Sequence, residues 1–123
     1  MKTAKDYLDE ANAQVTRIPA EEAIKKHGSD ALFVDVRDSG AIAKTGKIKG
    51  ALHAPRGFIE FMADENSQYH DPKFRKDADI HLVCGAGGQA ALAGKTLKEM
   101  GFQKVTNIGG IGDWKEAGGP MEE

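Results

Sequence analysis

The segment around the only cysteine of the chain constrains its fold more than any other feature. The apolar run 80–84 has the length of a buried strand, and it stops at four small residues, 85–88. A helical pattern then runs from about residue 89 to residue 100. A strand, a tight glycine loop and a helix in this order indicate an α/β fold whose strands run parallel.

Further short apolar runs alternate with helical stretches along the rest of the chain. Residues 31–36 are apolar on both faces up to Asp35, which predicts the central strand of a sheet covered by helices. Weaker strands are predicted at 15–18, 51–54 and 105–108, and helices at 19–26, 57–63 and around 113–115. We therefore expect an α/β fold with a central, mainly parallel five-stranded sheet flanked by helices on both faces.

The first residues carry a helical pattern of their own. Ala4, Leu8 and Ala11 recur at the three-to-four spacing that places apolar side chains on one face of a helix. No repeat and no Pro-rich or Ser-rich tract divides the remaining chain, and 123 residues suit one compact domain. We expect residues 1–14 to form an additional N-terminal helix, which covers the core or makes a dimer contact, and residues 15–123 to form a single domain.

The charge and cysteine content exclude several classes of function. With 17 Lys and Arg against 19 Asp and Glu, the formal net charge is -2, so no strong field attracts nucleic acid or anionic lipid. A single cysteine cannot form an internal disulfide, and the four histidines show no spacing suited to a metal. The first residues contain no apolar stretch typical of a signal or a membrane span. We expect a cytoplasmic protein without a metal, a cofactor, or a nucleic-acid or membrane partner.

Cys84 is the candidate functional residue because it ends a strand at the edge where open parallel sheets bind ligands. The small residues that follow let the backbone turn tightly, so several N–H groups can point at one anion. The helix beginning near Gln89 adds its positive end, and both effects favour a reactive thiolate. Two plainer interpretations stay open: Cys84 is an ordinary packed thiol, or the glycines form only a tight turn.

Several motifs follow one another between residues 15 and 120. They are Asp35-Val36-Arg37, Gly46-Lys47-Ile48-Lys49-Gly50-Ala51, Cys84 with its loop, Gly109-Gly110-Ile111, and then Trp114 and Gly118. In this order they resemble the single-domain rhodanese-like (sulfurtransferase) family.

The resemblance implies that Cys84 is the catalytic nucleophile. Its thiolate would take the outer sulfur from a donor such as thiosulfate, a persulfide or a polysulfide, and would pass it to a thiol or cyanide acceptor. A protein persulfide is a further partner that the resemblance allows. The resemblance also implies that loop amides bind the transferred sulfur, those of Gly85, Ala86, Gly87, Gly88, Gln89 and Ala90. The family's phosphatase-like relatives carry one more residue in this loop, so phosphatase or arsenate chemistry is disfavoured.

Two departures from the family pattern lead to specific expectations. Gln89 stands where the family usually has arginine, so the loop is uncharged and thiosulfate activity is expected to be weak. This difference leaves open a non-catalytic rhodanese-like binding module. Ala41 and Lys47 replace the usual glutamate and histidine, which implies that Arg37 lacks its customary carboxylate partner.

Three charged residues are assigned supporting roles. Asp35 ends a predicted strand, where it either accepts loop N–H groups from below or caps a helix over residues 38–44. Arg37 follows in the same motif and either supports the site or is a surface cation. Arg56 lies at another strand end and either replaces the missing loop charge or is solvated.

Overall fold

The computed structural model describes residues 1–123. In chain order the helices are α1 (Ala4–Gln14), α2 (Ala20–Ile24), α3 (Ser39–Thr45), α4 (Ile59–Ala63), α5 (Gly88–Glu99) and α6 (Ile111–Glu116). The strands are β1 (Thr16–Arg17), β2 (Leu32–Asp35), β3 (Lys47–Ile48), β4 (Leu52–His53), β5 (Asp79–Cys84), β6 (Lys104–Gly110) and β7 (Met121–Glu122). None of the helices has the length and apolar character that crossing a membrane requires.

Five strands form one sheet in the order β1-β6-β5-β2-β4, and every neighbouring pair in it is parallel. This confirms the predicted α/β fold with a five-stranded sheet. The middle strand is β5, so the expectation that residues 31–36 form the central strand was wrong. β2 lies beside β5, and both are almost fully buried. Their apolar patterns are alike for this reason and do not reveal which strand is in the middle.

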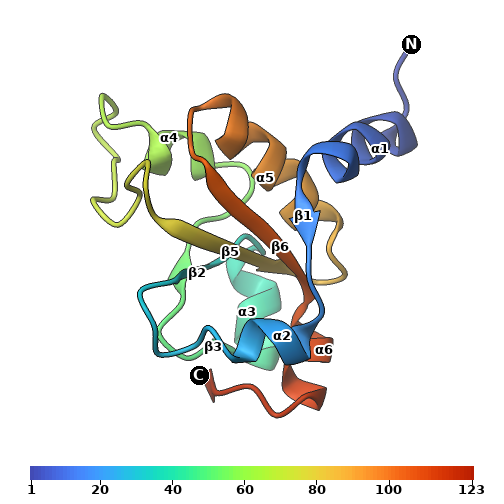
Figure 1. Ribbon diagram of the computed structural model, residues 1–123, viewed down its shortest axis with the longest axis vertical. Coiled ribbons are helices and arrows are strands. Elements are labelled where there is room, and N and C mark those ends of the chain that lie inside the picture. The colour runs from blue at the N-terminus through green and yellow to red at the C-terminus, as the bar shows by residue number, and fades with distance from the viewer.

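Helices cover both faces of the sheet, as predicted (Figure 1). The core on the face of α4 and α5 includes Leu82, Cys84 and Leu97. The core on the face of α2 and α6 includes Val83 and Trp114. Because successive side chains of a strand point to opposite faces, this alternation along β5 directs the only thiol to the side on which α5 packs.

The N-terminal helix α1 packs on the outside of α5. It begins with a capping box, in which Thr3 and Asp6 bond each other's backbone N–H, and Ala11 is fully buried. The chain then turns into β1 at Val15, whose side chain lies so close to Gly94 of α5 that a Cβ there would be 2.9 Å from Val15 Cγ1. This close packing fixes where β1 lies beside α5.

Candidate active site

Cys84 lies at the C-terminal end of the middle strand, and its sulfur is contacted by two backbone amides. The N–H of Gly87 donates to Sγ at 3.0 Å, and the N–H of Ala90 donates at 3.4 Å. The residue is only 1% exposed and belongs to the core that also contains Ala90. The thiol is therefore buried, as a packed cysteine would be, but it faces main-chain donors as well as hydrocarbon.

The turn after Cys84 follows from local backbone chemistry. Gly87 has φ of 103°, in the left-handed region that glycine adopts without strain, and it precedes the first residue of α5. The amides in the first turn of a helix have no acceptor within the helix. The amide of Ala90 is one of these, and it bonds Cys84 Sγ. The sulfur thus takes the place of an N-capping side chain at the start of α5.

The structure brings the six predicted loop residues, 85–90, into one turn around Cys84. Gly85, Ala86 and Gln89 are exposed, and their amides donate to no acceptor within the protein. The Gln89 side chain forms no hydrogen bond with another residue, and no loop residue is ionisable. The loop therefore presents peptide groups, rather than charged side chains, to anything bound there.

Strand β6 makes room for this turn. Gly110 of β6 is paired with Cys84 across a local irregularity in register. A Cβ on Gly110 would collide with the carbonyl oxygen of Gly85. The absence of a side chain at Gly110 therefore allows the first peptide of the loop to lie directly against β6.

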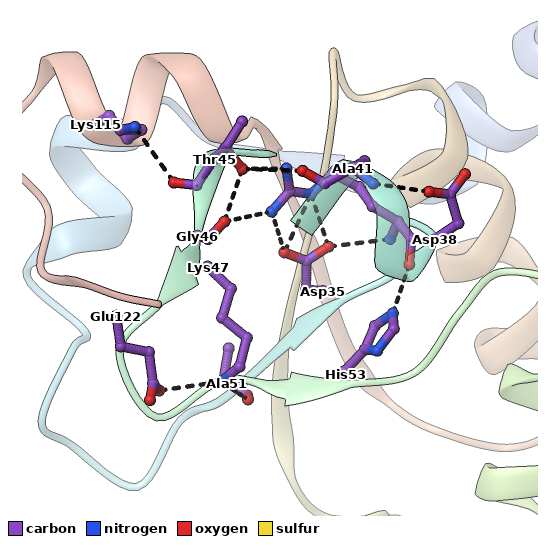
Figure 2. A network of polar contacts seen from close by, with 11 residues as sticks. Asp35, Asp38, Ala41, Thr45, Gly46, Lys47, Ala51, His53, Lys115 and Glu122 are labelled. Atoms are coloured by element: carbon purple, nitrogen blue, oxygen red, sulfur yellow. Dashed lines mark hydrogen bonds and ion pairs between the residues drawn. The ribbon is translucent and has the colours of Figure 1, made fainter. Parts of the chain in front are cut away.

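Asp35 and Arg37 form a buried pair at the end of β2, and two expectations about them were wrong. The Asp35 carboxylate accepts hydrogen bonds only from Arg37, through the backbone N–H, Nε and Nη2, and none from the loop around Cys84. Arg37 does have a carboxylate partner, which is the side chain of Asp35, two residues earlier in the chain (Figure 2). The helix α3 is capped instead by Asp38, whose Oδ1 accepts from the N–H of Ala41 at 2.9 Å.

The remaining contacts of Arg37 join neighbouring segments. Nη1 donates to Thr45 Oγ1 at 2.8 Å and Nη2 to the carbonyl of Gly46 at 2.9 Å, while His53 Nε2 lies 2.6 Å from the carbonyl oxygen of Arg37 (Figure 2). These contacts tie the end of β2 to α3 and β4. Arg37 is thus a buried structural cation, which excludes the alternative of a solvated surface arginine.

Arg56 does not replace the missing loop charge. Its Nη1 forms an ion pair with Glu60 at 3.2 Å, and its Nη2 donates to Thr96 Oγ1 at 3.1 Å. Both partners lie on helices, Glu60 on α4 and Thr96 on α5, so the guanidinium joins these helices rather than the loop.

Two residues that sequence reasoning missed contact the loop directly. Arg17 Nη2 donates to the carbonyl of Ala86 at 3.3 Å, and Asn107 Nδ2 donates to the carbonyl of Gly87 at 2.9 Å. They come from β1 and β6, and they are paired with each other in the register of those strands. No sequence signal marks them, because the register that pairs β1 with β6 depends on tertiary packing.

The comparisons with known proteins show which family the chain resembles in sequence and fold. Residues 19–117 match the family model of the rhodanese-like domain. A solved structure of a protein of unknown function from Rhodopseudomonas palustris, described as a possible tyrosine phosphatase, is 40% identical with a TM-score of 0.93, covering 99% of this chain and 96% of that one. The polysulfide-sulfur transferase homodimer of Wolinella succinogenes is 29% identical with a TM-score of 0.75, covering 96% and 85%.

A curated relative, YrkF of Bacillus subtilis, is named as a candidate sulfur carrier protein. It is 29% identical over 112 residues, which cover 89% of this chain but 56% of that protein, so this chain spans little more than half of its length. The family model covers most of the chain, and the five-stranded parallel sheet with its helices is the fold of the rhodanese-like neighbours. The chain belongs to the rhodanese-like domain family, and its relatives include proteins named for sulfur transfer and sulfur carriage.

Proposed function

We propose that this protein is a sulfurtransferase that carries a sulfane sulfur as a persulfide on Cys84. The observation that supports this function best is the pair of backbone amides, from Gly87 and Ala90, that donate to Cys84 Sγ at the start of α5. Donors in this position stabilise a thiolate, which is the nucleophilic form of cysteine. Relatives named for sulfur transfer and sulfur carriage support the same chemistry.

The reaction has two displacement steps, and no net oxidation is needed. In the first, the Cys84 thiolate attacks the outer sulfur of a donor, a new S–S bond forms, and the donor's own S–S bond breaks to release sulfite from thiosulfate, a thiolate from a persulfide or a shortened polysulfide from a polysulfide. In the second, an acceptor thiolate or cyanide attacks the terminal sulfur of the persulfide, and Cys84 leaves as a thiolate. Dividing the transfer through a covalent intermediate replaces one difficult step by two easier ones.

The loop sets the expected choice of donor. The amides of Gly85, Ala86 and Gln89 have no acceptor in the protein, so they are available to the anionic terminal sulfur of a persulfide. A thiosulfate donor also carries a sulfonate group, which an arginine at position 89 would bind and a neutral glutamine binds less well. Small persulfides and polysulfides are therefore the preferred donors, and thiosulfate is a poor one.

Intact-mass measurement tests this function. The purified protein is incubated separately with thiosulfate, polysulfide and cysteine persulfide, and the mass of one added sulfur atom is expected after the last two. The adduct should disappear on treatment with a reducing thiol and should be absent from Cys84→Ser. Transfer of the sulfur to added cyanide would show turnover. Absence of any reducible adduct with all three donors would refute the proposed function.

A non-catalytic binding module remains the second candidate, because Cys84 is only 1% exposed and the loop lacks a charged side chain. The same mass measurement separates the two, since a binding module would take up no sulfur. Phosphatase chemistry is disfavoured by the loop, which is one residue shorter than in the family's phosphatase-like relatives. Because a 40% identical structure is described as a possible tyrosine phosphatase, hydrolysis of a phenyl phosphate ester should be assayed alongside.

A further inference from the structure

One peptide group links the Cys84 sulfur to an arginine on the edge strand. Between Ala86 and Gly87, the N–H donates to Cys84 Sγ at 3.0 Å, while the carbonyl accepts from Arg17 Nη2 at 3.3 Å. A trans peptide is planar, with its N–H and carbonyl pointing in opposite directions. A contact that fixes the carbonyl of Ala86 therefore also fixes the direction of the N–H that meets the sulfur.

The next peptide group is held in the same way from β6. The carbonyl of Gly87 accepts from Asn107 Nδ2 at 2.9 Å, and Asn107 Oδ1 in turn accepts from the N–H of Gly109 at 2.8 Å. Asn107 is 1% exposed, and both ends of its amide are bonded, so its orientation is fixed. Arg17 and Asn107 are partners in the parallel register of β1 and β6. Two adjacent side chains thus hold two consecutive loop carbonyls, and we call this pair the carbonyl clamp.

The backbone leaves a slot for the guanidinium of Arg17. A Cβ on Gly87 would collide with it, and a Cβ on Gly109 would come within 3.1 Å of Nη2. Both glycines have positive φ, of 103° and 84°, so neither position suits a residue with a side chain. The guanidinium therefore packs against the backbone of two glycines, Gly87 in the loop and Gly109 in β6.

Arg17 is also the charged group that contacts the loop. The loop itself is uncharged, and Arg37 and Arg56 are engaged with Asp35 and Glu60. Three acidic side chains line the same surface cavity as Arg17, which has a volume of about 680 Å³, but none forms an ion pair with it. They are Glu21 on α2, and Asp113 and Glu116 on α6.

We propose that Arg17 and Asn107 are positioning residues for the sulfur-transfer reaction, with Arg17 supplying through the Ala86–Gly87 peptide the positive charge that the loop lacks. The catalytic meaning of this inference rests on the proposed function. A charged donor on a carbonyl polarises the peptide and strengthens the hydrogen bond that its N–H donates. The clamp therefore stabilises a negative charge on Cys84 sulfur without touching it.

Alkylation of Cys84 tests the clamp without requiring sulfur transfer. The rate of reaction with iodoacetamide is measured against pH for the wild type and for Arg17→Gln, Arg17→Lys and Arg75→Gln. Arg75→Gln is the matched control, because that side chain is 65% exposed and pairs only with Asp77. We expect Arg17→Gln to react about three- to tenfold more slowly near neutral pH, because one charge-assisted hydrogen bond is lost.

Arg17→Lys should recover most of the rate, because lysine keeps the charge. Arg75→Gln should match the wild type. The clamp is refuted if Arg17→Gln gives the same pH profile as Arg75→Gln, or if Arg17→Lys is no better than Arg17→Gln. An Asn107→Asp variant, which would place a carboxylate beside the Gly87 carbonyl, is expected to slow alkylation as well. If a folded Asn107→Asp protein gave the wild-type pH profile of alkylation, Asn107 would not be part of the clamp.

The outcomes also separate this inference from the proposed function. If the wild type takes up no sulfur but Arg17→Gln slows alkylation, the clamp stands and the proposed function fails. If Cys84 accepts sulfur normally and the Arg17→Gln alkylation profile is unchanged, the proposed function stands and the clamp fails.

Discussion

Arg37 Nη2 lies 2.7 Å from Asp35 Oδ2 in an ion pair whose side chains are 4% and 0% exposed. Nε of Arg37 contacts both carboxylate oxygens as well, so the pair has the forked geometry that makes arginine–carboxylate contacts strong. Through Thr45 and Gly46 the same guanidinium reaches the end of α3. The pair therefore holds together the segments next to the Cys84 strand.

Replacing Arg37 with methionine should lower the free energy of unfolding by about 3–5 kcal/mol, because Asp35 would be left as a buried charge without a partner. Urea unfolding measures this loss. Arg75→Met is the control: its pair with Asp77 spans 3.7 Å between side chains that are 65% and 83% exposed. An exposed pair of this kind contributes about 0–1 kcal/mol. Equal losses in the two variants would contradict the importance assigned to the buried pair.

Gly87→Ala should reduce both stability and sulfur uptake. The φ of 103° at this position strains a residue with a Cβ by about 1–2 kcal/mol, and the new methyl group would also displace the guanidinium of Arg17. Because the amide of Gly87 donates to Cys84 Sγ, any shift of the loop weakens the thiolate site. Thermal unfolding and intact mass after polysulfide treatment measure the two effects.

Gly57→Ala is the matched control for this substitution. Gly57 is exposed, its φ is not in the left-handed region, and a Cβ there would meet no atom within 4 Å. Stability and sulfur uptake should both stay near those of the wild type. If Gly87→Ala behaved as Gly57→Ala does, the loop would not depend on the left-handed turn.

The fold and the Cys84 loop were predictable because their signals are local. The length of an apolar run and the position of glycines identify a buried strand and a tight turn within about ten residues of sequence. The order of the strands was not predictable in this way, because β2 and β5 are both buried on both faces. The antiparallel pair of β3 and β7 was also missed, since two-residue strands show no periodicity.

The contacts of the charged residues depended on tertiary structure. Arg37 was expected to lack its customary carboxylate partner because positions 41 and 47 differ from the family pattern, but Asp35, two residues earlier in the chain, pairs with it instead. Arg17 and Asn107 meet the loop because the packing of Val15 against Gly94 and the pairing of β1 with β6 set their register. Neither relationship can be recognised from a local sequence pattern.

Gln89→Arg should improve the use of thiosulfate. Gln89 is exposed at the start of α5, where a guanidinium could bind the sulfonate of the donor. A hydrogen bond to a charged group contributes about 1.5–3 kcal/mol, so the donor KM should fall about ten- to a hundredfold. Steady-state transfer of sulfur from thiosulfate to cyanide measures the change. Uptake from polysulfide should change less, because the persulfide itself is bound by backbone amides.

Gln103→Arg is the control for added charge. Gln103 is also exposed, but it comes just before β6, whereas the Cys84 loop follows β5. Because these strands are parallel, Gln103 lies at the opposite end of the strands from the loop. It should leave the KM for thiosulfate unchanged. A KM for Gln89→Arg that rises, or that falls no further than in Gln103→Arg, would count against the explanation for weak thiosulfate activity.

Glu122 should make the stability of the protein depend on pH. Its carboxylate accepts from the N–H of Gly50 and from Lys47 Nζ, the latter shown in Figure 2. These contacts, the Gly50 bond first, hold the pKa of Glu122 below its ordinary value of 4.5. A carboxyl group whose pKa is lower in the folded state stabilises the fold above its unfolded pKa, and this contribution is lost as the pH falls through the folded value. Glu122→Gln should therefore lower Tm at neutral pH.

The difference in Tm between the wild type and Glu122→Gln should close as the pH is lowered below 4.5, because the wild-type carboxyl group then becomes protonated too. Added salt should also reduce it, since the ion pair with Lys47 is solvent-exposed on the Glu122 side. Glu123→Gln removes a neighbouring charge that makes no ion pair, and it should leave Tm nearly unchanged. A difference for Glu122→Gln that stays the same at low pH would mean that packing of β7 against β3, rather than the carboxylate charge, is what the substitution disturbs.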